Sequence, residues 1–201
     1  MTSSKNFNAT DYWNRRYEKG NHSGDGSYGK YAEFKAEIIN NIIHEHDSKS
    51  LIEFGCGDGN QLGLIDIEKY IGLDVSKKAI DMYISKYSES ETEKSFLLYD
   101  PFYFYSNGLT FDISMSLEVI FHIIDDEIYR KYLYDLFSSS HHLVIIFSSN
   151  FEEYKGVTSH IKHRAFTDYI SSTFTNWDLL KYIKNPHKDR KSNFYIYKRT
   201  N

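Results

Sequence analysis

The sequence predicts one α/β domain with a doubly wound, mainly parallel sheet, helices on both faces and an antiparallel C-terminal hairpin. Three observations favour this fold class. Apolar runs of strand length alternate with segments whose apolar residues recur at helical spacing. The run at 142–148 is almost continuously apolar, which is typical of a parallel strand buried on both faces. A glycine-rich turn follows the first apolar run, and no repeat or linker divides residues 1–201.

In the first half of the chain, an apolar stripe along 30–46 predicts a helix. Leu51 to Phe54 form the first predicted strand, and a short helix is expected near Asn60, a residue type that favours N-caps. A second strand is expected at 70–73. Ser76 then caps a helix that carries Ile80 and Tyr83 on its apolar face.

In the second half, strands are predicted at 96–99 and 111–117. Asp125 and Asp126 begin a helix, where acidic side chains suit the positive end of the helix dipole. The apolar strand at 142–148 and a helix at 164–173 follow. The segments 177–183 and 194–198 are expected to pair as the closing hairpin.

The composition excludes several classes of protein. The single cysteine, Cys56, rules out an internal disulfide or a cysteine-based metal cluster. No apolar stretch approaches the roughly 20 residues of a membrane-spanning helix. Residues 1–6 lack the apolar core of a signal peptide, so we expect a cytoplasmic protein. With 24 basic and 28 acidic residues the net charge is −4, which disfavours a nucleic-acid partner held by charge.

The most informative segment is Leu51–Asn60, where an acid, Glu53, precedes glycines at alternate positions 55, 57 and 59. This spacing differs from the G-x-G-x-x-G fingerprint of dinucleotide sites. A carboxylate before the glycines would repel a pyrophosphate but would suit a cationic ligand. Acidic or amide side chains also end the following strands, and ligands of such sheets bind beyond the carboxyl ends of the strands. One rim is therefore expected to carry Glu53, Asp74, Asp100, Glu118 and Asn150.

These residues resemble the cofactor motifs of the class I S-adenosylmethionine-dependent methyltransferases, a Rossmann-like family with a seven-stranded sheet. The resemblance implies that Glu53 and the glycines pass the methionine end of the cofactor. It also implies that Asp74 holds the ribose hydroxyls and that Asp100 lies near the adenine. The cofactor-binding residues expected from it are Trp13, Arg16, Glu53, Gly55, Cys56, Gly57, Gly59, Gln61, Asp74, Val75, Asp100, Pro101 and Leu117.

An oxygen or nitrogen acceptor needs a base, and His122, which follows the fourth strand, is one candidate. His160 and His163 are the others, in the segment after the fifth strand. Lys162 and Arg164 lie beside them and suggest an anionic acceptor, with Glu118 and Asn150 as further acceptor-binding residues. The alternative is a purely structural role for each of these histidines, and a solvated loop for the basic residues. A metal site built from Glu118, Asp125, Asp126 and Asn150 is the alternative considered, and no metal is predicted.

Residues 1–30 are predicted to form a lid. Trp13, Arg16 and Tyr17 match the W-x-x-R-Y opening of several small-molecule methyltransferases, and four glycines lie within 20–29. A segment that closes over donor and acceptor would exclude water. The alternative is a surface arm that only packs on the sheet.

The resemblance therefore predicts an S-adenosylmethionine-dependent methyltransferase. Similarity to members associated with sugar and polysaccharide pathways favours a small-molecule acceptor, a hydroxyl of a sugar, nucleotide sugar or glycan, methylated on oxygen. Two alternatives stay open. One is a methyltransferase for another small molecule or RNA, and the other is a cofactor-binding partner subunit without activity.

Overall fold

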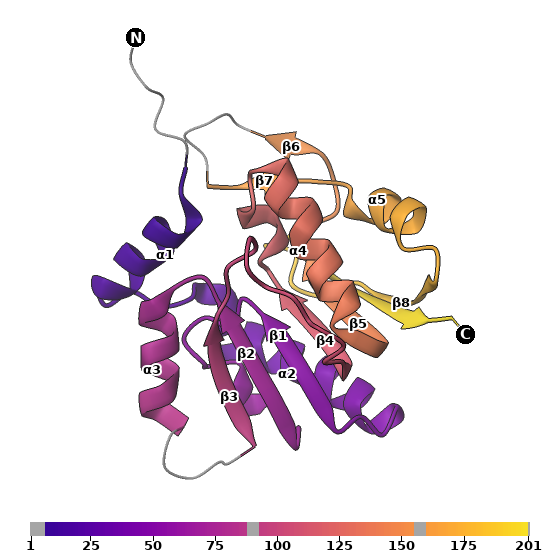
Figure 1. Cartoon of the computed structure of the whole chain (residues 1–201), viewed down its shortest axis with the longest axis horizontal. Coiled ribbons are helices and arrows are strands. Elements are labelled where there is room, and N and C mark those ends of the chain that lie inside the picture. The colour runs from indigo at the N-terminus through magenta and orange to yellow at the C-terminus, as the bar shows by residue number, and fades with distance from the viewer. Residues whose placement is uncertain (1–6, 88–92, 155–159, 201) are drawn as a thin grey trace.

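The computed structural model describes residues 7–87, 93–154 and 160–200, which form a central sheet between layers of helices (Figure 1). The seven-stranded sheet has the order β3-β2-β1-β4-β5-β9-β8. Its strands are β1 (Ser50–Phe54), β2 (Lys69–Asp74), β3 (Lys94–Leu98), β4 (Phe111–Leu117), β5 (Ser140–Ser148), β8 (Trp177–Ile183) and β9 (Asn193–Arg199). Strands β1 to β5 run parallel, and β9 is antiparallel to both β5 and β8. The predicted fold class and closing hairpin are confirmed.

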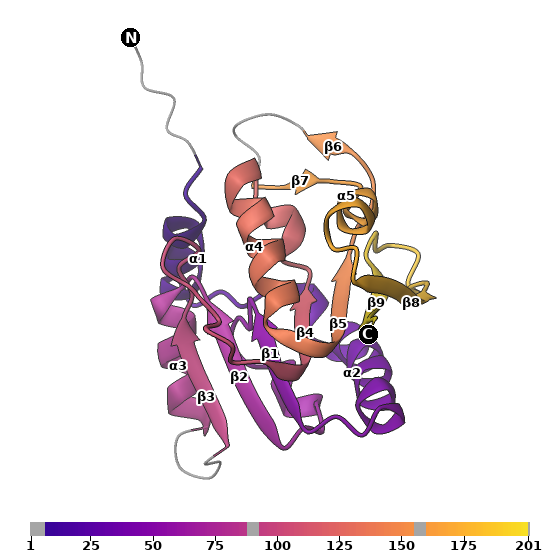
Figure 2. The same ribbon diagram turned by 45° about the vertical axis from the view of Figure 1, so that its right-hand side comes forward.

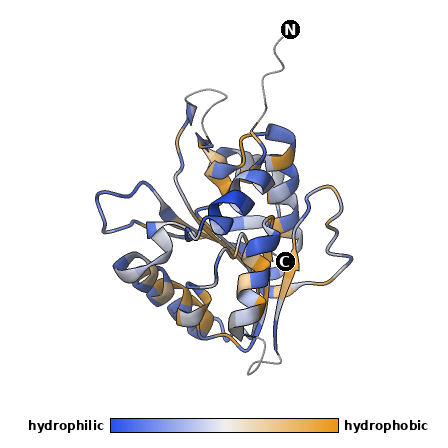
Figure 3. Cartoon of the chain, turned by 90° about the vertical axis from the view of Figure 1, so that its left-hand side faces the viewer, coloured by the Kyte–Doolittle hydropathy of each residue, from blue (hydrophilic) through white to orange (hydrophobic). Residues whose placement is uncertain are grey.

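Helices cover both faces of the sheet. Helices α2 (Gly29–Glu45) and α3 (Lys77–Tyr87) share one apolar core with one face of the strands, and α4 (Asp126–Ser138) and α5 (Phe166–Thr173) share a second core on the other. In Figure 1 α2 lies behind the sheet and α4 in front of it. These helices combine hydrophobic and hydrophilic residues, as the colouring of Figure 3 shows, because only one side of each meets the sheet.

Side-chain caps begin two of these helices where the sequence predicts. The Asp125 carboxylate accepts hydrogen bonds from the backbone N–H groups of Glu127 and Ile128 at 2.8 and 2.9 Å, which starts α4. The Ser76 hydroxyl accepts from the Ala79 N–H at 3.2 Å and starts α3. Both caps satisfy donors that a helix leaves free at its N-terminus.

One predicted element is wrong. The helix expected near Asn60 is only a 3₁₀ turn, η2 (Leu62–Leu64). Asn60 does not cap it, because its side-chain amide donates to the Ser27 carbonyl at 2.7 Å and joins the glycine loop to the N-terminal segment.

Outside the main sheet lie the N-terminal helix α1 (Ala9–Glu18), the short turns η1 (Asp25–Ser27) and η3 (Ile120–His122), and a two-stranded sheet of β6 (Glu153–Tyr154) and β7 (Lys162–His163). Figure 2 shows β6 and β7 beside the first turns of α4. Strands of two residues carry no detectable periodicity, which is why the sequence predicts only a loop there. Among the described residues, no helix combines the length and apolar character needed to cross a membrane.

Candidate active site

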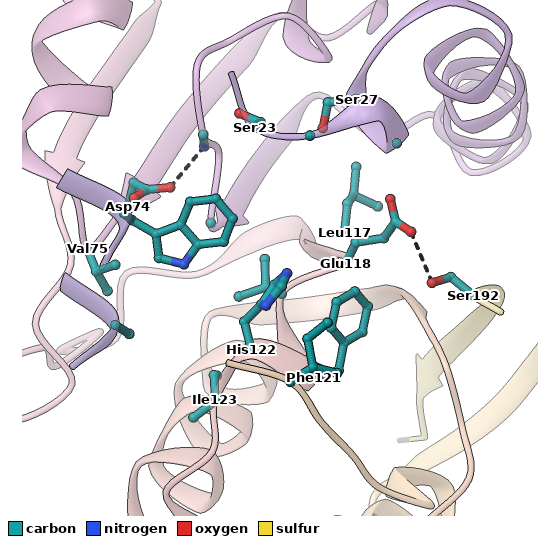
Figure 4. A pocket seen from close by; sticks show the side chains of 18 of the residues that line it. Ser23, Ser27, Asp74, Val75, Leu117, Glu118, Phe121, His122, Ile123 and Ser192 are labelled. Atoms are coloured by element: carbon teal, nitrogen blue, oxygen red, sulfur yellow. Dashed lines mark hydrogen bonds between the residues drawn. The ribbon is translucent and has the colours of Figure 1, made fainter. Parts of the chain in front are cut away.

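A cavity of about 660 Å³ opens at the carboxyl ends of β1, β2 and β4, where the strand order switches between β1 and β4. Its volume lies in the range of small-molecule sites. The predicted residues that line it are Trp13, Glu53, Gly55, Cys56, Gly57, Gln61, Asp74, Val75, Pro101, Leu117, Glu118, His122 and His163. Figure 4 shows His122 between Asp74 on one side and Glu118 on the other.

The glycine loop takes a conformation that disfavours other residues. Gly55, Gly57 and Gly59 all have positive φ angles, of 85°, 64° and 83°. A Cβ on Gly57 would lie 2.3 Å from the Ser23 hydroxyl, so this glycine lets the N-terminal segment approach. Gly59 does not line the cavity, and a Cβ there would lie 2.6 Å from the Tyr83 ring. The structure thus explains Gly59 by its close packing against α3, and its contact with a cofactor stays a prediction.

Asp74 ends β2 and braces this loop. One carboxylate oxygen accepts from the Gly57 N–H at 3.0 Å and the other from the Ser76 N–H at 2.8 Å (Figure 4). Burial raises the pKa of Asp74 to about 6, although these hydrogen bonds oppose that shift. Each oxygen retains a second lone pair, so the carboxylate can also accept hydrogen bonds from a ligand.

Glu53 lies at the base of the cavity and is 2% exposed. It accepts a hydrogen bond from the Tyr70 hydroxyl at 2.5 Å. Burial raises the pKa of Glu53 to about 7, while Tyr70 and the Lys35 ammonium oppose the shift. A cationic group in the cavity would favour the ionised carboxylate of Glu53 and be attracted to it.

Two predicted cofactor contacts have other partners. Asp100 does not line the cavity, because its carboxylate accepts from the Phe102 N–H at 2.9 Å and holds the turn after β3. Pro101, the next residue, does line the cavity. Arg16 also lies outside it and donates through Nε to the His22 carbonyl at 2.9 Å. The Cys56 thiol lines the cavity, and burial raises its pKa well above the usual value, which makes it unreactive.

His122 lies in η3, directly after β4. Its Nδ1 is 3.1 Å from the His160 carbonyl oxygen. Since a carbonyl only accepts, this contact places the proton on Nδ1 and leaves the lone pair on Nε2. Burial lowers the pKa of His122 to about 4, so its ring is neutral at neutral pH. The Trp13 indole packs edge-on against the imidazole, with centroids 5.2 Å apart.

The other two predicted histidines differ from each other. His163 lines the cavity, and its Nδ1 is 2.6 Å from the hydroxyl of Ser149, a buried residue just after β5 that also lines the cavity. His160 does not line the cavity; its ring stacks between those of Tyr12 and His122 at 4.9 and 5.4 Å. His160 therefore orients His122 instead of facing a ligand.

The basic and amide residues predicted to bind the acceptor have structural partners. Lys162 and Arg164 both pair with Asp126, at 2.7 and 2.8 Å, and neither lines the cavity. Arg164 also donates to the Ile123 and Ile124 carbonyls, so it fixes the segment after η3. Asn150 bonds to Thr167, where it caps α5. These residues therefore have structural contacts in the described part of the chain, and their assignment to the acceptor stays a prediction. Among the same described residues, no group of three or more His, Cys, Asp or Glu side chains is arranged to hold a metal ion.

Glu118 does lie at the cavity and joins three segments there. Its backbone has a φ of 59°, which is unusual for a residue with a side chain. The carboxylate accepts from the Ser192 hydroxyl at 3.1 Å and lies 3.8 Å from the buried Lys35 ammonium. A Cβ on Gly26 would lie 2.1 Å from it, so the N-terminal segment passes directly over Glu118.

The N-terminal segment closes over the glycine loop through Asp58, which the sequence analysis missed. One Asp58 oxygen accepts from the Ser23 N–H at 2.7 Å and from the Tyr28 hydroxyl at 2.9 Å. The Asp58 N–H donates to the Ser23 hydroxyl at 2.9 Å, and Tyr17 also contacts that hydroxyl. Residues 23–27 consequently form one wall of the cavity. The described part of the segment predicted to form a lid lies against the glycine loop, while its residues 1–6 lie outside the described range.

We expect Asp58→Asn to loosen this closure. The neutral amide accepts more weakly than the carboxylate, which lowers the free energy that holds residues 23–28 against the glycine loop by roughly 1.5 kcal/mol. The population in which this segment is detached then increases about tenfold. Limited proteolysis between residues 20 and 28 should therefore be about tenfold faster than in the parent protein. Asp66→Asn is the matched control, because the Asp66 carboxylate is exposed and contacts the His44 ring, while its backbone N–H, which the substitution keeps, donates to Asn40 of α2. Equal cleavage rates in all three proteins would contradict the role of Asp58.

The fold and this cavity define a Rossmann-like α/β protein with its ligand site at the topological switch point. No protein-family model matches the sequence, and no curated protein is significantly similar to it. Solved structures do share the fold, and methyltransferases are among them.

One is magnesium protoporphyrin IX methyltransferase from Synechocystis PCC 6803 with bound SAH, at 14% identity and a TM-score of 0.72, covering 95% of this chain and 98% of that one. Another is an S-adenosylmethionine-dependent methyltransferase from Clostridium acetobutylicum, at 12% identity and a TM-score of 0.70, with 96% and 100% covered. A third is the methyltransferase domain of bacterial CtHen1-C, at 16% identity and a TM-score of 0.68, with 84% and 98% covered. The chain thus has the class I methyltransferase fold.

Proposed function

We propose that this protein binds S-adenosylmethionine and transfers its methyl group to a small-molecule acceptor. The observation that carries the proposal is the arrangement of the cavity. The glycine loop and the buried carboxylates Glu53 and Asp74 line one side, and two histidines line the other. The neighbouring structures that share the fold are methyltransferases, one of them with SAH bound, which supports the same donor.

The residues present fit this donor. Asp74 has free lone pairs for ribose hydroxyls, while the bare backbone at Gly55 and Gly57 permits close approach. Val75 and Pro101 offer apolar contact where an adenine would lie. The donor supplies a methyl group on a positively charged sulfur, and the nearby carboxylates of Glu53 and Asp74 suit that charge.

His122 is the group we assign as general base. Its Nε2 carries the lone pair, so it can accept the proton that an acceptor hydroxyl loses. The low pKa of about 4 keeps the ring unprotonated, and the His160 carbonyl holds its orientation. The covering segment at 23–27 and α1 excludes water, which aligned methyl transfer requires. His163 with Ser149 offers a second proton acceptor in the same cavity.

For the acceptor we propose a hydroxyl of a sugar or nucleotide sugar, as the resemblance implies. The cavity size and the net charge of −4 favour a small molecule over RNA. The structural neighbours include a protoporphyrin methyltransferase and a small RNA methyltransferase, so the shared fold does not select an acceptor. A cofactor-binding subunit without activity is the second candidate, since donor binding alone does not require His122.

Calorimetry with S-adenosylmethionine, S-adenosylhomocysteine, NAD and ATP tests the donor. We expect binding of the first two only. Incubation with radiolabelled donor and a panel of sugars, nucleotide sugars, oligosaccharides and RNA then tests transfer. Tight binding of NAD or ATP without binding of either sulfur compound would overturn the proposal. Donor binding with no transfer to any acceptor would favour the inactive subunit.

A further inference from the structure

The turn between β8 and β9 brings four consecutive residues, Asp189 to Ser192, to the wall of the cavity. The Ser192 hydroxyl donates to Glu118 at 3.1 Å, which ties this turn to the end of β4 (Figure 4). The C-terminal hairpin therefore contributes to the site as well as closing the sheet. Its turn provides Arg190 and Lys191, the cationic side chains that line the cavity within the described part of the chain.

Arg190 is held in place but its hydrogen-bonding capacity is not used. Its guanidinium lies over the Tyr31 ring, 4.2 Å from the centroid, which fixes the side chain. The Nε atom is buried and has no hydrogen-bond partner among the described residues. The Asp189 carboxylate is 3.9 Å from it, beyond hydrogen-bonding distance. Because Nε has no exposed surface, an anion in the cavity would be bound through the terminal Nη groups of this side chain, which is 29% exposed and lines the cavity.

The carboxylates around Arg190 are bound to other groups. Asp189 accepts a hydrogen bond from Tyr31, and Glu118 is engaged by Ser192 and by the Lys35 ammonium. Glu153 is paired with Lys191 at 3.4 Å. Lys35 is 2% exposed and adds a second buried cation near Arg190. Asp189 still forms an ion pair with the guanidinium, but it is 59% exposed, so solvent weakens that pair and leaves the guanidinium able to attract a second anion.

We propose that Arg190 binds an anionic group of the acceptor, a carboxylate or a phosphate, and thereby selects acceptors that carry one. The planar guanidinium offers parallel donors that match both oxyanions. The inference rests on the proposed methyltransferase function, because it assigns this wall to the acceptor. It also transfers the anion-binding role expected at Lys162 and Arg164 to a different part of the chain.

The experiment compares the parent protein with Arg190→Gln, Arg190→Lys and the control Arg199→Gln. Arg199 is exposed at the other end of β9, over Trp177. Calorimetry measures the affinity of inorganic phosphate and of acetate at constant ionic strength, with S-adenosylhomocysteine present. We expect Arg190→Gln to weaken binding of at least one anion tenfold or more, and Arg199→Gln to change it less than twofold. The anion affinity of Arg190→Lys should lie between those of the other two variants, since lysine keeps the charge but lacks the two parallel N–H donors of the guanidinium.

Comparing the two anions shows which kind of anionic group the acceptor carries. Preference for phosphate points to a nucleotide sugar or phosphosugar acceptor, and preference for acetate to a carboxylate-bearing one. Absence of binding by either anion, or equal binding by Arg190→Gln, would overturn the inference. Titration of S-adenosylhomocysteine alone into each variant confirms that the fold is intact. If that titration also fails in the parent protein while anions still bind at Arg190, the proposed donor is wrong but this anion site stands.

Discussion

Replacing Asp74 with Ala is expected to reduce affinity for S-adenosylmethionine and S-adenosylhomocysteine by roughly 100-fold or more. Hydrogen bonds to a charged acceptor contribute about 1.5 to 3 kcal/mol each, and two lost ribose contacts account for that factor. The same carboxylate braces the Gly57 and Ser76 N–H groups, so the glycine loop loses its shape as well. Asp74→Asn keeps the size of the side chain and separates the loss of charge from the loss of volume.

Calorimetry measures this effect, with circular dichroism and thermal unfolding to verify the fold. Asp81→Asn is the matched control, because Asp81 lies exposed on α3 and pairs only with Lys77. Unchanged donor affinity in both Asp74 variants would remove the ribose assignment.

The pH dependence of donor binding provides a separate test of Asp74. Its folded pKa of about 6 lies above the usual value of 3.8, because burial disfavours the charged form. In the free protein this group therefore favours folding at low pH, and that contribution is lost as the pH rises through 6. Donor binding requires the carboxylate, so affinity should fall up to tenfold per pH unit below about 6. The Asn variant should lose the part of the dependence centred near pH 6 and keep the part that Glu53, with a pKa of about 7, contributes.

The sequence predicts the sheet well because buried parallel strands are long apolar runs with polar residues at their ends. Strand β4 spans the predicted 111–117, and β5 begins only two residues before the predicted start. The same property places Asp74 correctly, since an acid that directly follows a buried strand must lie on the rim. The helix cap at Asp125 is equally predictable from the sequence, because a cap depends only on neighbours within three residues.

The contacts that the sequence does not reveal depend on partners far away in the sequence. Lys162 and Arg164 have the composition of an anion site, yet Asp126 lies opposite them and neutralises both. Asp58 and Ser149 acquire their roles only when Ser23 and His163 pack against them. In the sequence, the charged turn that contains Arg190 looks like any solvated turn. Only the structure shows that the hydrogen bond from Ser192 to Glu118 brings it to the cavity. Local patterns therefore located the glycine loop and Asp74, while the wall formed by residues 189–192 required the tertiary structure.

Replacing His122 with Ala is expected to lower kcat by roughly 10²- to 10⁴-fold, the usual contribution of a general base, with donor affinity unchanged. Because the Nδ1 proton is fixed by the His160 carbonyl, the reacting lone pair is on Nε2. His142→Ala is the control, since His142 lies at the opposite end of β5 and does not line the cavity. The measurement is methyl incorporation into the acceptor that the panel identifies, with His163→Ala assayed in parallel.

The pH profile of kcat distinguishes His122 from the other titratable groups of the cavity. His122 must be unprotonated to act, and burial holds its folded pKa at about 4, so activity should persist down to about pH 4 before His122 itself is protonated. Donor binding weakens earlier, near pH 6, because of Asp74, so the profile must be recorded at saturating donor. An acid limb that disappears in His163→Ala would instead assign the base to His163. Full rates in both histidine variants would mean that the acceptor loses its proton without help from either side chain, and the base role would be abandoned.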